Sequence, residues 1–360
     1  MSPLDRPGPS ARGRRRTTLG AALLAAVLLF SLFTFTGLGQ QVLCLGGAAL
    51  CDSRAITTPG ATASPGSGSG TDGAKGGAKG GGKAAPKGCA SPAACGFPHA
   101  GSTGPRTAAL TPQNTGNAAI RTDGTVIKGW DITGSLDIYA NDVTVVDSRI
   151  TSTNWWGINL RPGYSGLRVL HTTITAVPGK GPNNGGSDYA VSNMSTSSVE
   201  VAFCDVSVFG DALSMGQGNL HDNYVHDIEP FKNLDGQWQH TNAVISNGGG
   251  KGRLIIRHNT LLNPTPVDQG ASAAVGLFAD SAPVTNTLVD DNWLAGGAYA
   301  LYAGGKDSSG IEVTDNVFSP QYHPNGGKYG AVAYWNPTGR GNVWRGNRMA
   351  NGTPVVPDQP

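Results

Sequence analysis

The stretch Ile311-Glu312-Val313-Thr314-Asp315-Asn316-Val317-Phe318 decides the fold of this chain, because its pattern recurs along the sequence. Its third and eighth places are large apolar residues, and its sixth place is Asn. A repeat of this kind indicates a stacked architecture. Copies begin at Thr125, Val143, Leu167, Val199, Gly218, Leu254, Thr287, Ile311 and Asn342.

Two columns of the repeat are apolar in every copy. Alternate residues of a strand point to the same side, so the third place marks the buried side of one strand and the eighth place that of the next. One copy cannot hide such a face from water, whereas stacked copies can. The third places are Ile127, Val145, Val169, Val201, Leu220, Ile256, Val289, Val313 and Trp344, and the eighth places are Ile132, Ile150, Ile174, Val206, Val225, Leu261, Leu294, Phe318 and Met349.

The sixth place adds a polar column. Stacked Asn side chains hydrogen-bond along a column, at a bend that Asn tolerates well. A third apolar strand lies between most copies, and no helical period competes with it. These features predict an all-β chain that forms a right-handed parallel β-helix, a single-stranded solenoid of about nine coils, over residues 96–360. The sixth places are Trp130, Ser148, Thr172, Cys204, Asn223, Asn259, Asn292, Asn316 and Asn347, and the third strands begin at Gly157, Tyr189, Ala212, Ala243, Ala274, Tyr299 and Gly330.

The beginning of the chain predicts export. Residues 1–18 carry five arginines and are expected to be a cytoplasmic flank, and residues 19–38 are uncharged and rich in Ala, Leu and Phe. Their length, near the ~20 residues of a membrane span, favours a transmembrane anchor over a cleaved signal peptide. We expect a single-pass protein of the cell membrane with an extracellular C-terminal domain, or a secreted protein if the segment is cleaved.

Residues 39–95 are interpreted as a linker with two cysteine pairs. Gly, Ala, Ser, Pro and Lys dominate 55–86, as in flexible tethers. Cys44 with Cys51, and Cys89 with Cys95, are candidates for small disulfide loops in an oxidising compartment. Cys204 lies in the Asn column and is expected to be a buried free thiol. The net charge of only +2 gives no reason to expect nucleic-acid binding, and we expect a monomer.

The longest step between copies, from Gly218 to Leu254, concentrates the chemically active side chains. Loops that leave a β-helix run along its flank, so a long insertion predicts the wall of a groove. This stretch combines histidines, carboxylates, a lysine and a tryptophan, namely His226, Asp227, Glu229, Lys232, Trp238 and His240.

Several runs resemble a known family. Gly96-Phe97-Pro98, the rung from Val143 to Ile150, the segment from Asn223 to His240, and Arg257-His258-Asn259-Thr260 look like exported right-handed β-helix proteins of actinobacteria, within the broad pectate-lyase-like superfamily. The likeness covers residues 96–349, and its motifs are specific for the fold. Where that family usually has His-Thr-Asp-Gly-Ile-Gln, this chain has His240 to Ile245, with Asn242 in place of the Asp.

The same run is similar to the Asn-Thr-Asp motif of polygalacturonases, whose paired carboxylates on neighbouring coils act as acid and base. Hydrolysis of that type needs two carboxyl groups ~5 to 9.5 Å apart. Asp211 stands on the preceding coil, but Ser272, Ala273 and Ala274 stand where a second acid is expected. The sequence therefore argues against this hydrolase.

A polysaccharide lyase acting on a uronate-containing polymer is the favoured hypothesis. β-Elimination needs a base for the proton beside the uronate carboxylate. His226 or His240 is the candidate base, with Lys232 as second choice, and Asp211 completes the catalytic candidates. In a less demanding interpretation, His226 and Asp227 only hydrogen-bond loop backbone.

A lyase also has to neutralise the uronate carboxylate. Asn242, Arg257 or a Ca²⁺ ion held by Asp211 and Asp227 is the candidate for that role. Asp227 and two further loop residues, Trp238 and Glu229, are candidate substrate contacts.

The alternative is a non-catalytic glycan-binding or envelope-structural module, whose partner is a cell-envelope polysaccharide. Aromatic rings in loops and at strand edges stack on sugars or pack the loops onto the coil. Clustering on one flank favours binding, and scattering favours packing. The rings are Trp155, Trp156, Tyr164, Phe231, Trp238, Tyr322, Tyr334 and Trp335.

Overall fold

The computed structural model describes residues 54–55 and 88–357, all within one compact unit of the chain, Ser53–Pro360. The predicted flank 1–18, the membrane segment 19–38, the Cys44 and Cys51 pair, and most of the linker lie outside these residues. Within the described part, no helix has the length and hydrophobicity to cross a membrane.

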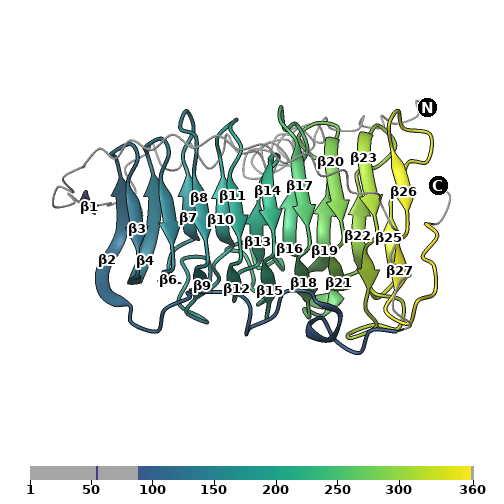
Figure 1. The fold of residues 1–360 in the computed structure, drawn as a ribbon, viewed down its shortest axis with the longest axis horizontal. Helices are drawn as coiled ribbons and strands as arrows, with labels where there is room; N and C mark the ends of the chain where they lie inside the picture. Colours follow the sequence, from purple (N-terminus) through teal and green to yellow (C-terminus); the bar gives the residue numbers. More distant parts are fainter. Residues whose placement is uncertain (1–53, 56–87, 358–360) are drawn as a thin grey trace, which may run out of the picture. The chain divides into compact units, whose positions relative to one another are not determined.

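The described chain is all-β and winds into a solenoid of parallel strands, consistent with a parallel β-helix (Figure 1). Most turns contribute one short strand to each of three rows. The first row is a nine-stranded sheet of β3 (Val126–Lys128), β5 (Thr144–Val146), β8 (Arg168–Leu170), β11 (Glu200–Ala202), β14 (Gly218–His221), β17 (Leu254–Arg257), β20 (Thr285–Asp290), β23 (Ser309–Thr314) and β26 (Val343–Arg345).

The second and third rows form one 18-stranded sheet, because β2 (Thr111–Ile120) and β4 (Trp130–Ile138) are long enough to span both. β1 (Arg54–Ala55) pairs with β2. The second row continues with β6 (Arg149–Ser152), β9 (Thr173–Ala176), β12 (Asp205–Ser207), β15 (Tyr224–His226), β18 (Thr260–Asn263), β21 (Trp293–Gly296), β24 (Val317–Phe318) and β27 (Arg348–Met349). The third row continues with β7 (Trp156–Leu160), β10 (Tyr189–Asn193), β13 (Asp211–Ser214), β16 (Thr241–Ser246), β19 (Ala271–Leu277), β22 (Tyr299–Ala303) and β25 (Gly330–Ala333).

The register of the strands confirms the repeat. Each third-place residue from Ile127 to Trp344 is the direct partner of the next along the first row. Each eighth-place residue from Ile132 to Met349 does the same along the second row. Apart from the last coil, both columns are fully buried and form the core.

The sixth-place side chains are buried from Ser148 to Asn347, and the Asn residues among them form a ladder, as predicted. From Asn223 to Asn347, each Asn amide but the last donates to the side-chain oxygen of the next Asn, at 2.9 Å. The residue before each sixth place is left-handed in most coils, which bends the chain from the first row to the second. Cys204 is buried in the same column as a free thiol, and burial raises its pKa to about 12, which disfavours the reactive thiolate.

The segment 88–110, here called the strap, runs along the stack from its last coil toward its first (Figure 1). The amide of Cys89 donates to the carbonyl of Ala350 at 2.7 Å, and Arg106 pairs with Asp147 at 2.7 Å. Between them, Phe97 packs against Trp293. The strap contains the 3₁₀-helix η1 (Ala93–Cys95), and its Cys89–Cys95 disulfide confirms that predicted pair.

Candidate functional site

Two long loops cover the bend between the second and third rows. The early loop, 177–188, joins β9 to β10, and the late loop, 227–240, joins β15 to β16, while the coil between them turns within 208–210. Hydrogen bonds join the two loops. The side-chain amide of Asn183 donates to Asn233 Oδ1 at 2.6 Å, and the side-chain amide of Asn184 donates to the backbone carbonyl of Asn233 at 2.7 Å. They therefore close over the short bend that precedes Asp211.

Two carboxylates lie under these loops. Asp188 ends the early loop, and its carbonyl accepts the amide of Asp211, the first residue of β13, at 2.8 Å. Gln239 of the late loop donates to both Asp188 oxygens, at 3.1 and 3.3 Å. The Asn242 amide donates to Asp211 Oδ1 at 2.8 Å, and all three side chains are buried.

Burial keeps a proton on this pair. It raises the pKa of Asp188 to about 7, although hydrogen bonds from Tyr189 and Gln239 oppose it. Burial, and then the negative charge of Asp188, raise the pKa of Asp211 well above its ordinary value. Two carboxyl groups that cannot both ionise near neutral pH are suited to serve as acid and base.

This pair corrects the sequence interpretation. A second acid was expected on the coil after Asn242, where Ser272, Ala273 and Ala274 stand, whereas the carboxylate that lies beside Asp211 is Asp188, on the preceding coil. The signal was present in the sequence, because Asp188 precedes a short apolar strand in the same way as Asp211 does. The early loop hid it, since 12 residues separate β9 from β10.

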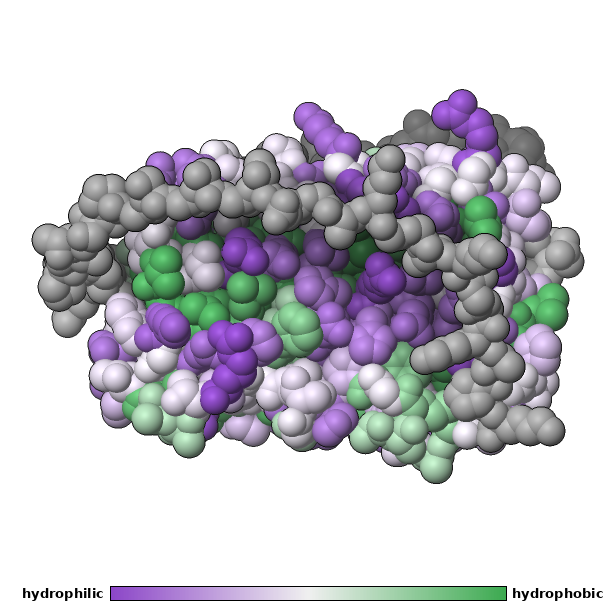
Figure 2. All heavy atoms as spheres, in the orientation of Figure 1, coloured by the Kyte–Doolittle hydropathy of each residue, from purple (hydrophilic) through white to green (hydrophobic). Residues whose placement is uncertain are grey.

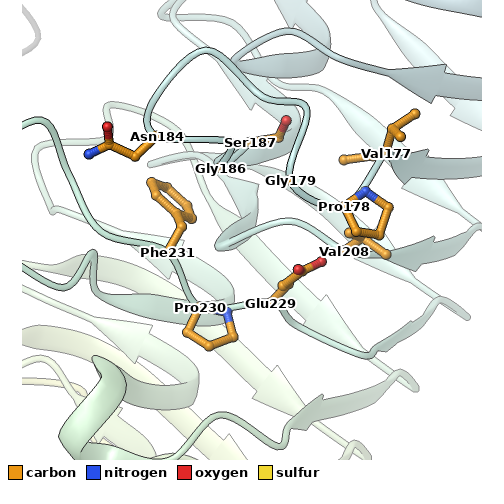
Figure 3. A pocket seen from close by; sticks show the side chains of 12 residues that line it. Val177, Pro178, Gly179, Asn184, Gly186, Ser187, Val208, Glu229, Pro230 and Phe231 are labelled. Atoms are coloured by element: carbon orange, nitrogen blue, oxygen red, sulfur yellow. The ribbon is translucent and has the colours of Figure 1, made fainter.

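A small pocket of about 140 Å³ lies between the two loops (Figure 3). Glu229, Pro230 and Phe231 of the late loop line it together with Gly186 and Ser187 of the early loop. The Phe231 ring lies so close to Gly186 that a Cβ there would sit 2.0 Å from it, which explains the glycine. The buried Ser187 hydroxyl has no hydrogen-bond partner among the described residues. Glu229, predicted as a substrate contact, therefore lines a pocket between the two loops.

The other predicted loop residues remain at the surface. Lys232 places its Nζ 5.1 Å from the centre of the Trp238 ring, and that ring is 36% exposed. His240 is exposed immediately before β16. The late loop therefore carries Lys232, Trp238 and His240 as well as Gln239, which donates to Asp188.

His226 belongs to a different cluster. Its Nε2 contacts Asp205 at 2.9 Å and its Nδ1 contacts Asp227 at 2.7 Å. Burial alone lowers the pKa of His226, but these two carboxylates outweigh it and raise the pKa above the usual value. Because both ring nitrogens already contact carboxylates, neither is free to take a proton from a substrate.

Arg257 and the two candidate calcium ligands, Asp211 and Asp227, lie in different parts of the fold. Arg257 lies in β17 of the first row, where it pairs with Asp290 at 3.5 Å. Asp211 is buried in the third row, whereas the Asp227 side chain is 76% exposed and bonded to His226. Within residues 54–55 and 88–357, no group of three or more His, Cys, Asp or Glu side chains is arranged to hold a metal ion.

A comparison with known proteins found no matching family model, curated protein or solved structure.

Proposed function

We propose that this chain is an exported, carbohydrate-active right-handed parallel β-helix of the pectate-lyase-like type that cleaves a polysaccharide. The observation that supports this most strongly is the buried pair Asp188 and Asp211, on successive coils under two joined loops. In this proposal, residues 19–38 anchor a monomer to the membrane, and the third row faces an extracellular polymer. The surface in Figure 2 suits a hydroxyl-rich ligand, because hydrophilic residues gather over the middle of the face in view.

The chemistry uses one protonated and one ionised carboxyl group. The protonated member gives its proton to the glycosidic oxygen as the C–O bond breaks, and the ionised member draws a proton from the attacking water or attacks the sugar carbon itself. Asn242 holds Asp211 in place through its amide. The late loop has to move to admit a sugar, because Asp188 exposes none of its surface and Asp211 only 3%.

A uronate lyase with His226, His240 or Lys232 as the base is the second candidate. Exposed His240 and Lys232 support it, because both lie on the late loop close to Trp238. His226 supports it less, since both of its ring nitrogens contact carboxylates.

The test incubates the full-length protein with a panel of neutral and uronate polysaccharides, with and without Ca²⁺. Hydrolysis releases reducing ends without new ultraviolet absorbance, whereas elimination adds the absorbance of an unsaturated product. We expect reducing ends alone, and we expect Asp211→Asn and Asp188→Asn each to lower the rate at least about 100-fold.

Matched variants separate the candidates. Asp280→Asn changes an exposed carboxylate and should keep the wild-type rate. If an unsaturated product appears, and is lost in His240→Ala or His226→Ala but kept in Asp211→Asn, the lyase replaces the hydrolase. No product from any polymer, with polysaccharide still bound, leaves the non-catalytic glycan-binding module.

A further inference from the structure

We propose that five aromatic side chains on the last third-row coils form a binding site for a neutral pyranose polymer. They are Phe278, Tyr299, Tyr302, Tyr329 and Tyr334, here called the tyrosine platform. The inference deepens the proposed function, because it assigns a sugar-binding surface to the same row of strands.

The rings contact one another in a continuous group. Tyr302 is the hub, with its ring centre 5.1 Å from Phe278, 5.4 Å from Tyr299 and 5.6 Å from Tyr334. Tyr329 joins through Tyr299 at 6.0 Å. Aromatic pairs at these separations hold each other in fixed orientations, so the surface is largely formed before a ligand arrives.

Packing alone does not account for the group. Tyr329 is 63% exposed and Tyr334 is 68% exposed, although both are large apolar rings. Tyr334 also has a φ of 57°, a left-handed conformation that is unfavourable for a bulky residue. The exposed ring faces of Tyr329 and Tyr334 are therefore available to a ligand.

The local chemistry selects an uncharged ligand. The ring contacts described within this group all join one aromatic ring to another, so it offers apolar ring faces and phenol hydroxyls to a ligand. Flat rings bind the C–H faces of pyranoses, and the phenol groups at the ring edges exchange hydrogen bonds with sugar hydroxyls. The ligand class is therefore a neutral pyranose polymer with equatorial hydroxyls, such as a β-1,4-linked glucan.

The platform adjoins the carboxylate pair through Gly276. A Cβ on this residue would lie 2.3 Å from the Phe278 ring and 2.7 Å from Asn242 Oδ1, so the ring and the amide flank one glycine. That buried Oδ1 has no hydrogen-bond partner among the described residues. The register continues from Gly276 to Tyr302 and on to Ala333, which precedes Tyr334. One polymer chain can therefore cross both sites.

The test measures binding of a β-1,4-linked glucose hexasaccharide to the full-length protein by titration calorimetry, with a galacturonate hexasaccharide as the charged comparison. We expect the neutral ligand to bind more tightly. Tyr329→Ala and Tyr334→Asn should each weaken its affinity about tenfold, equivalent to about 1.4 kcal/mol. Asn adopts a left-handed φ readily, so Tyr334→Asn should keep the local backbone, and a weaker affinity then reports the lost ring.

Two controls complete the design. Tyr334→Phe keeps the ring and should bind within about twofold of wild type. Val126→Ala truncates an exposed apolar residue of β3 and should change nothing. Failure of the neutral ligand to bind, or unchanged affinity in both tyrosine variants, overturns the platform. Asp211→Asn separates the two proposals, because it should abolish cleavage and leave this binding intact.

Discussion

At the scale of single residues, burial decides what Asp188 and Asp211 can do. An exposed Asp ionises near pH 4, whereas burial raises the pKa of Asp188 to about 7, and burial together with the charge of Asp188 raises the pKa of Asp211 well above its ordinary value. Asp147 shows the opposite case, since the hydrogen bond from Arg106 lowers its pKa to about 2. The sequence shows the same residue type at all three positions.

The raised pKa values predict how stability depends on pH. Between pH 4 and pH 7 the native state binds more protons than the unfolded state, so the free energy of unfolding should fall as pH rises. Asp211→Asn should flatten this slope and raise the melting temperature at pH 8 by about 5 °C, because its side-chain oxygen still accepts the Asn242 amide. Asp280→Asn is the exposed control. A wild-type slope in Asp211→Asn would contradict the assignment.

At the scale of elements, the Asn ladder fixes the bend between the first and second rows. Asn292 donates to Asn316 Oδ1 and to two backbone carbonyls, and it accepts from Asn259. Each bond is buried or nearly so, so each lost partner leaves a polar group without water.

Asn292→Ala should therefore lower the free energy of unfolding by about 3 kcal/mol, measured by chemical denaturation. Thr285→Ala changes an exposed residue of the same coil and should cost less than about 0.5 kcal/mol. An equal loss of unfolding free energy in the two variants would show that the ladder does not stabilise the fold.

An Asn can also be added to the ladder, because Cys204 occupies the position next to Asn223. Its amide already donates to Asn223 Oδ1 at 3.0 Å. Cys204→Asn should extend the ladder by one coil and keep or raise the melting temperature. Cys204→Asp, of similar size but without amide donors, should lower it clearly.

The strap is the second element whose role is structural. Phe97 is 5% exposed and stacks on His258 at 5.6 Å, which holds the segment against the second row. Phe97→Ala should cost about 3 kcal/mol and speed hydrogen exchange in residues 88–110. Leu234→Ala, at an 80% exposed position, should leave both measurements unchanged. Wild-type exchange in the strap of Phe97→Ala would show that the disulfide suffices.

At the scale of the whole stack, the coils bring distant parts of the sequence into one row. Asp188 directly precedes β10 and Asp211 begins β13, whereas the tyrosine platform runs from Phe278, which follows β19, to Tyr334, which follows β25. From β13 to β25 there are four strand spacings, about 19 Å. The far end of the platform, at Tyr334, is therefore separated from the carboxylate pair by a length that only a polymer spans, although its near end at Phe278 adjoins Asn242.

This separation predicts a dependence on ligand length. Cleavage efficiency, measured as kcat/KM, should rise with the length of a neutral oligosaccharide until the chain spans about 19 Å, and then level off. Tyr334→Asn should remove the gain for long substrates and leave short ones unaffected. A kcat/KM that is independent of length would show that the two sites do not share a chain.

The sequence by itself determined the solenoid, because a stack needs the same inward positions in every coil, and the columns from Ile127 to Trp344 and from Ile132 to Met349 satisfy that need locally. It also determined the Asn ladder, the Cys89–Cys95 pair and the buried Cys204. The tertiary structure decided the candidate site. Asp188 joins Asp211, His226 is drawn to Asp205, and Arg257 lies in another row, because loop closure and row membership depend on how whole coils stack. Spacing along the chain does not encode those contacts.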